Sequence, residues 1–286
     1  MSDHSLNVDY TASELRYNAF MTPAYRSALA ALDLSEGTHV LDVGCGPGGL
    51  FPLLAQEVGP QGHITGVDGS QLHLDAARDV AKQHEVQTPL TLVQADLRQP
   101  LEFAGHTFDA AWCADVLWPN LFPNPVAVVR ELARVVKPGG VIAIFFGNFY
   151  RALYLPGYRR LEWLAANAGN LQWQNDEQVT SVASIPSSYE RALQWLQEIG
   201  LRTCTLTVHP LFYQQPLPTE IRDYLASYVF AEAFGPAVQS CGAEVGMSDA
   251  ERGYFSDLTT PESPHYLLDQ PDYYCLQTAV LATGHV

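Results

Sequence analysis

Basic residues are scarce in this 286-residue chain, which holds 15 lysines and arginines against 31 aspartates and glutamates and has a formal net charge of −16. Lys82 and Lys137 are the only lysines, and Arg159 and Arg160 form the only adjacent basic pair. Affinity for nucleic acids depends on clustered cations that neutralise phosphates. We therefore expect no nucleic-acid partner and attribute the acidity to solubility.

Three further absences narrow the class of protein. The cysteines are scattered, with no CxxC and no Cys/His spacing typical of zinc, so we expect isolated thiols and no metal. No apolar run approaches 18 residues, which argues against a membrane span. The first ten residues lack the basic and apolar regions of a secretory signal. We expect a soluble cytoplasmic protein, a monomer or homodimer, that binds a small molecule.

Apolar segments typical of strands alternate with helical patterns over the first half of the chain. The predicted strands are Val40–Val43, Ile64–Val67, Leu90–Val93, Phe108–Cys113 and Val141–Phe146. The predicted helices are Gly49–Val58, Gln71–His84 and Pro125–Val136, after an N-terminal helical pattern interrupted near Pro23. Such alternation predicts an α/β fold with a doubly wound, largely parallel sheet.

The alternation of strand and helix patterns stops after Phe146 and resumes in two later segments. Helix 188–199 and strand 202–209 come between two aromatic-rich interruptions, the second of which carries helical patterns at 220–234 and 248–258, and residues 273–283 read as a last strand. The predicted parts are an N-terminal helical cap (1–35), a cofactor-binding core (36–147, continued at 187–210 and 272–286) and two mainly helical lid insertions (148–186 and 211–271).

A glycine-rich loop follows the first predicted strand, in the sequence VLDVGCGPGG from Val40 to Gly49. Its glycines allow a sharp turn and a close approach to a ligand, because no Cβ is in the way. The spacing Gly44-x-Gly46-x-x-Gly49 also satisfies the dinucleotide fingerprint, so the loop alone does not choose a cofactor. Asp68, 24 residues beyond Gly44, can bind the ribose hydroxyls of either a nicotinamide or an adenosyl cofactor.

Four further features favour S-adenosylmethionine over a nicotinamide cofactor. Asp42 stands where a dinucleotide strand is usually apolar, and Asp96 in QADL follows the third strand. FDAAWCADVLW begins the fourth strand, and VVKPGGVIAIFF joins a helix to the fifth through a tight turn. Together they resemble the class I S-adenosylmethionine-dependent methyltransferases, particularly the ubiquinone- and menaquinone-biosynthesis type. The resemblance is strong over Val40–Phe146 and architectural elsewhere. It implies a Rossmann-like sheet of seven strands, the last antiparallel between the fifth and sixth.

The resemblance also implies a role for each matching residue. The methionine part of S-adenosylmethionine would meet the loop and the end of the fourth strand, and its ribose and adenine would meet the ends of the second and third. The implied cofactor-binding residues are Asp42, Gly44, Cys45, Gly46, Gly48, Asp68, Gly69, Ser70, Asp96, Leu97, Cys113 and Ala114. One departure is that Trp118 and Pro119 follow Val116-Leu117, where many relatives carry histidine.

Candidates for catalysis are fewer, because methyl transfer relies mainly on holding two reactants in line. Asp115 can act as a general base, although a capping or cofactor-facing acid is the alternative. His209 and Tyr150 are further candidates, each with a packing role as the alternative. Trp118, Tyr154 and Tyr17 are candidate substrate contacts.

The sequence thus favours methyl transfer to a small apolar or aromatic metabolite, with oxygen preferred as acceptor over carbon or nitrogen. The alternatives are an adenosylmethionine-fold protein recruited as a cyclase, decarboxylase or pericyclic catalyst, a nicotinamide oxidoreductase, and a non-catalytic binding subunit.

Overall fold

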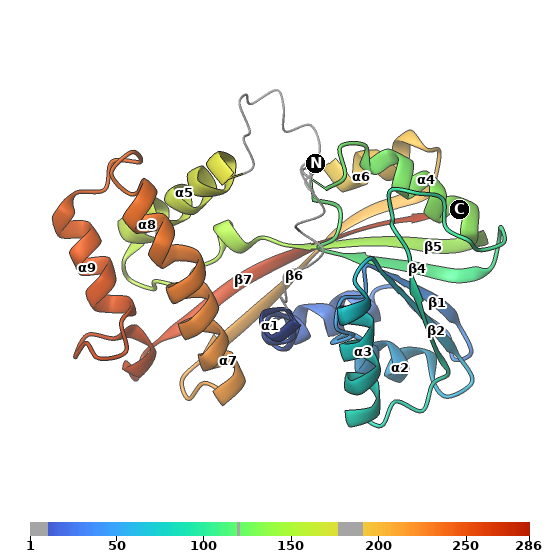
Figure 1. Ribbon diagram of the computed structural model, residues 1–286, viewed down its shortest axis with the longest axis horizontal. Coiled ribbons are helices and arrows are strands. Elements are labelled where there is room, and N and C mark those ends of the chain that lie inside the picture. The colour runs from blue at the N-terminus through green and yellow to red at the C-terminus, as the bar shows by residue number, and fades with distance from the viewer. Residues whose placement is uncertain (1–10, 119–120, 177–190) are drawn as a thin grey trace. The chain divides into compact units, whose positions relative to one another are not determined.

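The computed structural model describes residues 11–118, 121–176 and 191–286 (Figure 1). The chain divides into two compact units. The first unit comprises the described residues of Met1–Gly147, Pro186–His209 and Ala279–Val286, and the second those of Asn148–Ile185 and Pro210–Thr278.

Within the described residues, the strands form one seven-stranded sheet in the order β3-β2-β1-β4-β5-β7-β6. They are β1 (His39–Val43), β2 (His63–Asp68), β3 (Leu90–Gln94), β4 (Phe108–Ala114), β5 (Val136–Gly147), β6 (Arg202–Gln214) and β7 (Tyr274–His285). The pairs β1–β2, β1–β4, β2–β3 and β4–β5 are parallel, whereas β7 is antiparallel to β5. The predicted doubly wound sheet, with its last strand antiparallel between the fifth and sixth, is confirmed.

Helices of the first unit cover both faces of its sheet. They are α1 (Thr11–Ala30), α2 (Phe51–Val58), α3 (Gln71–Gln83), α4 (Pro125–Val135) and α6 (Ala192–Glu198). Figure 1 shows α4 and α6 on one side of the sheet and α1, α2 and α3 on the other. Leu132 of α4 and Trp195 of α6 join Leu41 and Ile142 of the sheet in one buried cluster. Residues 188–190 of the predicted helix 188–199 lie outside the described residues.

Helix α1 runs through Pro23, so the predicted interruption is wrong. Proline inside a helix removes one backbone hydrogen bond and costs about 3 kcal/mol. Burial on both sides of the proline outweighs this cost, since Phe20, Met21 and Tyr25 are all buried.

The KPGG segment is part of β5, so the tight turn predicted between helix and strand is wrong in its placement. Strand β5 begins at Val136, which pairs with Phe108, and the register then shifts so that Ala110 pairs with Val141. The intervening residues bulge out of the ladder, and Gly139 has a positive φ of 84°. The two glycines of KPGG are compatible with a bulge as well as with a tight turn, because both use glycine at left-handed backbone positions.

The second unit is mainly helical. It contains η2 (Phe149–Arg151), α5 (Arg159–Asp176), α7 (Thr219–Asp223), the π-helix η5 (Tyr224–Phe234), α8 (Gly235–Cys241), α9 (Asp249–Thr259) and η6 (Leu267–Asp269). A capping box of Ser248 and Glu251 begins α9, close to the predicted start. The predicted helix 220–234 is divided between α7 and η5, and the sequence analysis assigned no helix to α5 or α8.

Aromatic side chains form the core of the second unit. The ring of Phe149 lies 5.5 Å from the rings of both Tyr154 and Phe234. Tyr154, Tyr224 and Phe234 are at most 1% exposed. These aromatic residues therefore stabilise the second unit itself.

The described residues lack a membrane-spanning helix and a metal-binding cluster. None of their helices combines the length and apolar character that a membrane crossing requires. They also hold no group of three or more His, Cys, Asp or Glu side chains suited to a metal ion.

Candidate functional site

The glycine-rich loop lies at the carboxyl edge of the parallel strands of the first unit. Strand β1 is bordered by β2 on one side and β4 on the other, so the chain leaves β1 at a point where the strand order reverses. Ligands of open α/β sheets bind at such switch points. The segments that follow β1, β2 and β4 therefore meet where a ligand is expected.

The loop conformation requires glycine. Gly44, Gly46 and Gly48 have φ values of 70°, 50° and 76°, which side chains rarely adopt. A Cβ on Gly44 would lie 2.4 Å from the Val116 side chain. The amides of Gly44 and Cys45 both donate to the carbonyl of Val67, at 2.7 and 3.0 Å, which ties the loop to the end of β2.

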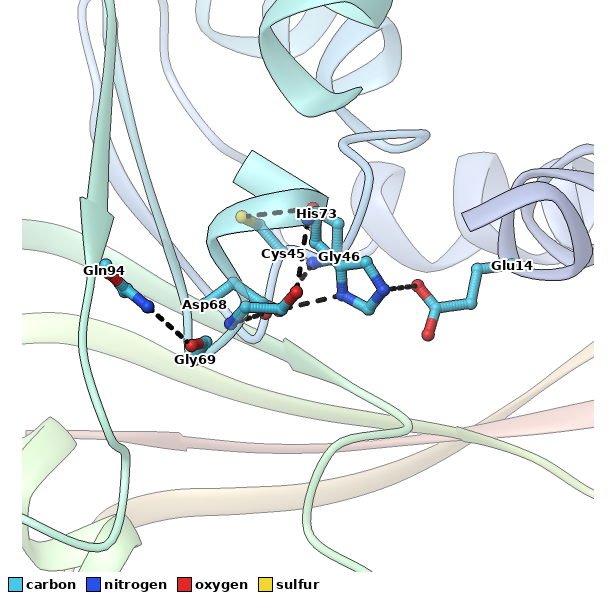
Figure 2. Close-up of polar contacts among 8 residues, drawn as sticks. Glu14, Cys45, Gly46, Asp68, Gly69, His73 and Gln94 are labelled. Carbon is cyan, nitrogen blue, oxygen red and sulfur yellow. Dashed lines mark hydrogen bonds and ion pairs between the residues drawn. The ribbon is translucent and has the colours of Figure 1, made fainter. Parts of the chain in front are cut away.

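Asp68 is held beside the loop by backbone amides (Figure 2). Its Oδ2 accepts from the amide of Gly46 at 3.0 Å, and its Oδ1 accepts from the amide of Ser70 at 2.8 Å. Nδ1 of His73 lies 3.5 Å from Oδ1. A carboxylate has about four acceptor positions, so these contacts orient Asp68 and leave capacity for a ligand hydroxyl. Gln94 donates to the carbonyl of Gly69 at 3.0 Å and so supports the same turn.

Asp42 lies under the loop and is only 3% exposed. Within the described residues its Oδ2 has no hydrogen-bond partner. Burial, with a further contribution from the charge of Asp68, raises the pKa of Asp42 to about 7. Buried polar atoms are nearly always paired, so an orphaned carboxylate oxygen indicates a position completed by a ligand or a water.

Two buried thiols line the same region. Cys45 and Cys113 have thiol pKa values raised by burial and by the nearby charge of Asp42. A thiol becomes nucleophilic only as the thiolate. Both cysteines are therefore neutral thiols, and Ala114 follows Cys113 at the end of β4.

Asp115 follows β4 and joins three segments of the first unit. Its Oδ1 accepts from the amide of Gly147 at 2.9 Å, and its Oδ2 accepts from the hydroxyl of Tyr17 at 2.8 Å. Burial raises the pKa of Asp115 to about 6, against the opposing effect of these two hydrogen bonds. The structure thus brings together Asp115 and Tyr17, which the sequence analysis treated as separate candidates.

Asp96 follows β3 and is exposed. It accepts two hydrogen bonds from the guanidinium of Arg98, at 2.8 and 3.0 Å, and these lower the pKa of its carboxyl group. The neighbouring Leu97 is partly buried against the main apolar cluster.

The other catalytic candidates lie elsewhere or are not fully described. His209 is buried on β6, where Nδ1 contacts the Ser27 hydroxyl at 2.9 Å and Nε2 contacts the Thr207 hydroxyl at 2.8 Å. Burial lowers the pKa of His209, so the ring is neutral and bridges two hydroxyl groups. The backbone of Tyr150 lies in η2, and its side chain is outside the described residues.

The remaining substrate candidates differ in exposure. Trp118 is 41% exposed. Tyr154 is fully buried in the second unit, where its hydroxyl donates to Oε1 of Gln277 at 2.5 Å. Pro119, which follows Trp118, lies outside the described residues.

Sequence reasoning missed Glu14 and His73. Figure 2 shows Glu14 reaching from α1 toward His73, which in turn lies beside Asp68. Oε2 of Glu14 is 3.8 Å from Nε2 of His73. Neither residue belongs to the glycine loop or to the QADL or KPGG segment. Only the fact that His73 stands one turn after Ser70, in the helix that follows Asp68, could have pointed to it.

Comparisons with known proteins agree with this geometry. Residues 34–197 match the methyltransferase domain family. A demethylmenaquinone methyltransferase of Listeria welshimeri is 32% identical over 118 residues, or 41% of this chain and 48% of the relative. A ubiquinone biosynthesis O-methyltransferase of Vibrio cholerae is 38% identical over 115 residues, or 40% and 43%. The matched region thus spans less than half the length of these relatives.

Solved structures extend the likeness in fold to nearly the whole chain. An S-adenosylmethionine-dependent methyltransferase of Geobacter sulfurreducens, in complex with S-adenosyl-L-homocysteine, has a TM-score of 0.51 at 19% identity. The alignment covers 98% of this chain and all of that one. A second structure, of a Bacillus halodurans protein described as a methyltransferase, has a TM-score of 0.52 at 17% identity and covers 91% and 97%. With its matched domain and its sheet order, the chain belongs to the methyltransferase domain family, in the class I S-adenosylmethionine-dependent group.

Proposed function

We propose that this protein transfers the methyl group of S-adenosylmethionine to a hydroxyl group of a small apolar or aromatic metabolite. The observation that carries this proposal is the set of carboxylates around the glycine loop. Asp42, Asp68 and Glu14 all lie near enough to Cys45 for their charges to raise the pKa of its thiol. A dinucleotide pyrophosphate would be repelled there, whereas a ligand that carries ammonium and sulfonium groups is attracted.

The residues present fit this cofactor. Asp68, oriented by two backbone amides, would accept hydrogen bonds from the ribose hydroxyls. The orphaned Oδ2 of Asp42 would receive the ammonium group through a water. The loop Gly44–Gly48, with Cys113 and Ala114, would line the methionine part. Gly69 and Ser70 would flank the ribose, and Asp96 and Leu97 would contact the adenine.

The bound cofactor supplies an electrophilic methyl group, and the protein supplies alignment and a proton acceptor. With a pKa of about 6, Asp115 is largely ionised at neutral pH and can take the proton of an acceptor hydroxyl. Tyr17 and Gly147 hold the carboxylate in one orientation.

Calorimetry tests the cofactor, and a transfer assay tests the base. We expect micromolar binding of S-adenosylhomocysteine and no binding of NAD; the reverse result would refute the proposal. With labelled cofactor and a panel of small phenols, Asp115→Asn should lower the rate by about 10²–10⁴-fold while leaving cofactor affinity unchanged. Matched anilines serve as the control for acceptor type, and methylation of the anilines alone would overturn the assignment of oxygen.

A further inference from the structure

Helix α1 places a carboxylate directly over the glycine loop. A Cβ built on Gly46 would lie 2.9 Å from Oε2 of Glu14, so this side chain touches the loop at its left-handed glycine. Nε2 of His73 lies 3.8 Å from the same oxygen, and Nδ1 of His73 faces Asp68. Figure 2 shows Glu14, His73 and Asp68 in one row along the loop. Glu14 is therefore part of the wall of the site, although it is distant from the loop in sequence.

Carboxylates outnumber the other ionisable groups of this wall, and His73 lies between two of them. The carboxylates of Asp42, Asp68 and Glu14 all act on Cys45, and Asp68 also acts on Asp42. Gathering like charges beside a buried loop costs stability unless a cation offsets them. Asp42 adds an independent sign of a ligand, because its Oδ2 is buried without a hydrogen-bond partner among the described residues. These charges are arranged for a positively charged ligand.

We propose that Glu14 is a cofactor-binding residue that distinguishes the cationic sulfonium form of the cofactor from its neutral thioether product. This inference rests on the proposed function. When the bond between sulfur and the methyl carbon breaks, its electron pair stays on sulfur, and the acceptor oxygen gains the methyl group and loses its proton to Asp115. The cofactor thereby loses one positive charge. S-Adenosylmethionine has a net charge of +1 and S-adenosylhomocysteine has none, so the charge of Glu14 favours binding of the first and release of the second.

The side chain of Glu14 is suited to this task by its partial exposure. It is 40% exposed, so solvent reaches the carboxylate. Asp68 is anchored by two backbone amides, and its removal would disturb the loop itself. Glu14 touches the loop only through its side chain, and the charge can be removed while the backbone of α1 is kept.

Calorimetry on the full chain tests this inference with both cofactor forms as probes. In Glu14→Gln we expect affinity for S-adenosylmethionine to fall about tenfold and affinity for S-adenosylhomocysteine to fall less than about threefold. Glu14→Asp, which keeps the charge, should restore much of the difference. Glu102→Gln removes one exposed carboxylate between β3 and β4 and should change neither affinity. Thermal unfolding of each variant without ligand checks that α1 stays folded.

The outcomes separate this inference from the proposed function. An equal loss of affinity for both probes, or no loss for either, would show that Glu14 does not distinguish the two charge states of the cofactor. The proposed function would still stand. An equal loss in Glu102→Gln would also overturn the role of Glu14, since any surface charge would then have the same effect. If the unmodified protein binds neither probe, the proposed function fails first and this inference fails with it.

Discussion

Two carboxyl groups, one in each compact unit, have similarly raised pKa values but differ in their hydrogen-bond partners. Asp42 in the first unit and Glu162 of α5 in the second both have pKa values raised by burial to about 7. Oε2 of Glu162 accepts hydrogen bonds from the amides of Tyr154 and Leu155, the first at 3.0 Å. Oδ2 of Asp42 has no such partner among the described residues.

The difference separates an acid with backbone partners from an acid with a buried, unpaired oxygen. Glu162 satisfies backbone amides that would otherwise be unpaired, so its burial stabilises the second unit. Asp42 contributes no such bond through Oδ2, so its burial costs stability that a ligand can recover. A raised pKa by itself therefore does not indicate function, whereas a raised pKa with an unpaired oxygen at a switch point does.

The largest effect on stability should come from Glu162→Ala. The substitution leaves the amides of Tyr154 and Leu155 without their acceptor, and should cost about 3 kcal/mol of unfolding free energy. Denaturant unfolding measures this loss. Glu244→Ala, at an exposed position in the same unit, is the control and should change stability by less than about 0.5 kcal/mol. An unchanged free energy of unfolding in Glu162→Ala would mean that the two amides find other acceptors.

Asp68→Ala should have the largest effect on cofactor affinity. Loss of the ribose acceptor, together with the support that Asp68 gives to the loop, should weaken binding of S-adenosylhomocysteine by about 1–3 kcal/mol in calorimetry. Asp75→Ala is the matched control, because Asp75 lies on the exposed face of α3 and pairs with Arg78. Unchanged affinity in Asp68→Ala would refute the proposed ribose contact.

Asp42→Asn should stabilise the ligand-free protein at high pH and weaken cofactor binding. The folded-state pKa of Asp42 is about 7 and the unfolded value about 3.9, so the native protein binds more protons between these values. Its stability therefore falls as the pH rises from about 4 to 7, and the variant lacks this loss.

Unfolding at pH 8 should show Asp42→Asn to be more stable than the unmodified protein by about 2 kcal/mol, and the gap should close near pH 4. A variant that is less stable at pH 8 would show that Asp42 has a structural partner like that of Glu162. Asp42 and Glu162 would then not differ in the way described.

Asp96→Ala should have the smallest effect on stability. Asp96 and Arg98 are both exposed, and an exposed pair contributes less than about 0.5 kcal/mol because solvent screens it. The proposed adenine contact should still appear as a loss of about threefold in affinity for S-adenosylhomocysteine. Equal affinity for the variant and the unmodified protein would remove Asp96 from the proposed site.

The sequence predicted the first unit better than the second. Strands β1 to β4 were predicted to within about one or two residues of their ends, because apolar runs bounded by glycine and acidic residues are local signals. Helix α5 was missed, although its buried residues Leu161, Leu164, Ala165 and Ala168 stand at helical spacing. The π-helix η5 was read as part of one regular helix, because its wider turn has no local sequence signal.

For the candidate site, the sequence predicted the residues at strand ends better than the residues on helices. Gly44 and Asp115 directly follow β1 and β4, and Asp68 ends β2, so their meeting at one edge of the sheet could be inferred from the order of the strands. Glu14 and His73 come from helices, and their approach to the loop depends on how α1 and α3 pack. Tyr17 was a candidate, but its bond to Asp115 could not be foreseen for the same reason.

By itself, the sequence determined the sheet, the left-handed glycines of the loop and the acid that ends β2. Each depends on a few neighbouring residues, through the period of burial or the backbone freedom of glycine. The tertiary structure alone decided which carboxylates are satisfied and which are left for a ligand. Asp42 and Glu162 are both acids beside apolar residues, and only the packing of distant segments supplies amides to one and leaves an oxygen of the other unpaired.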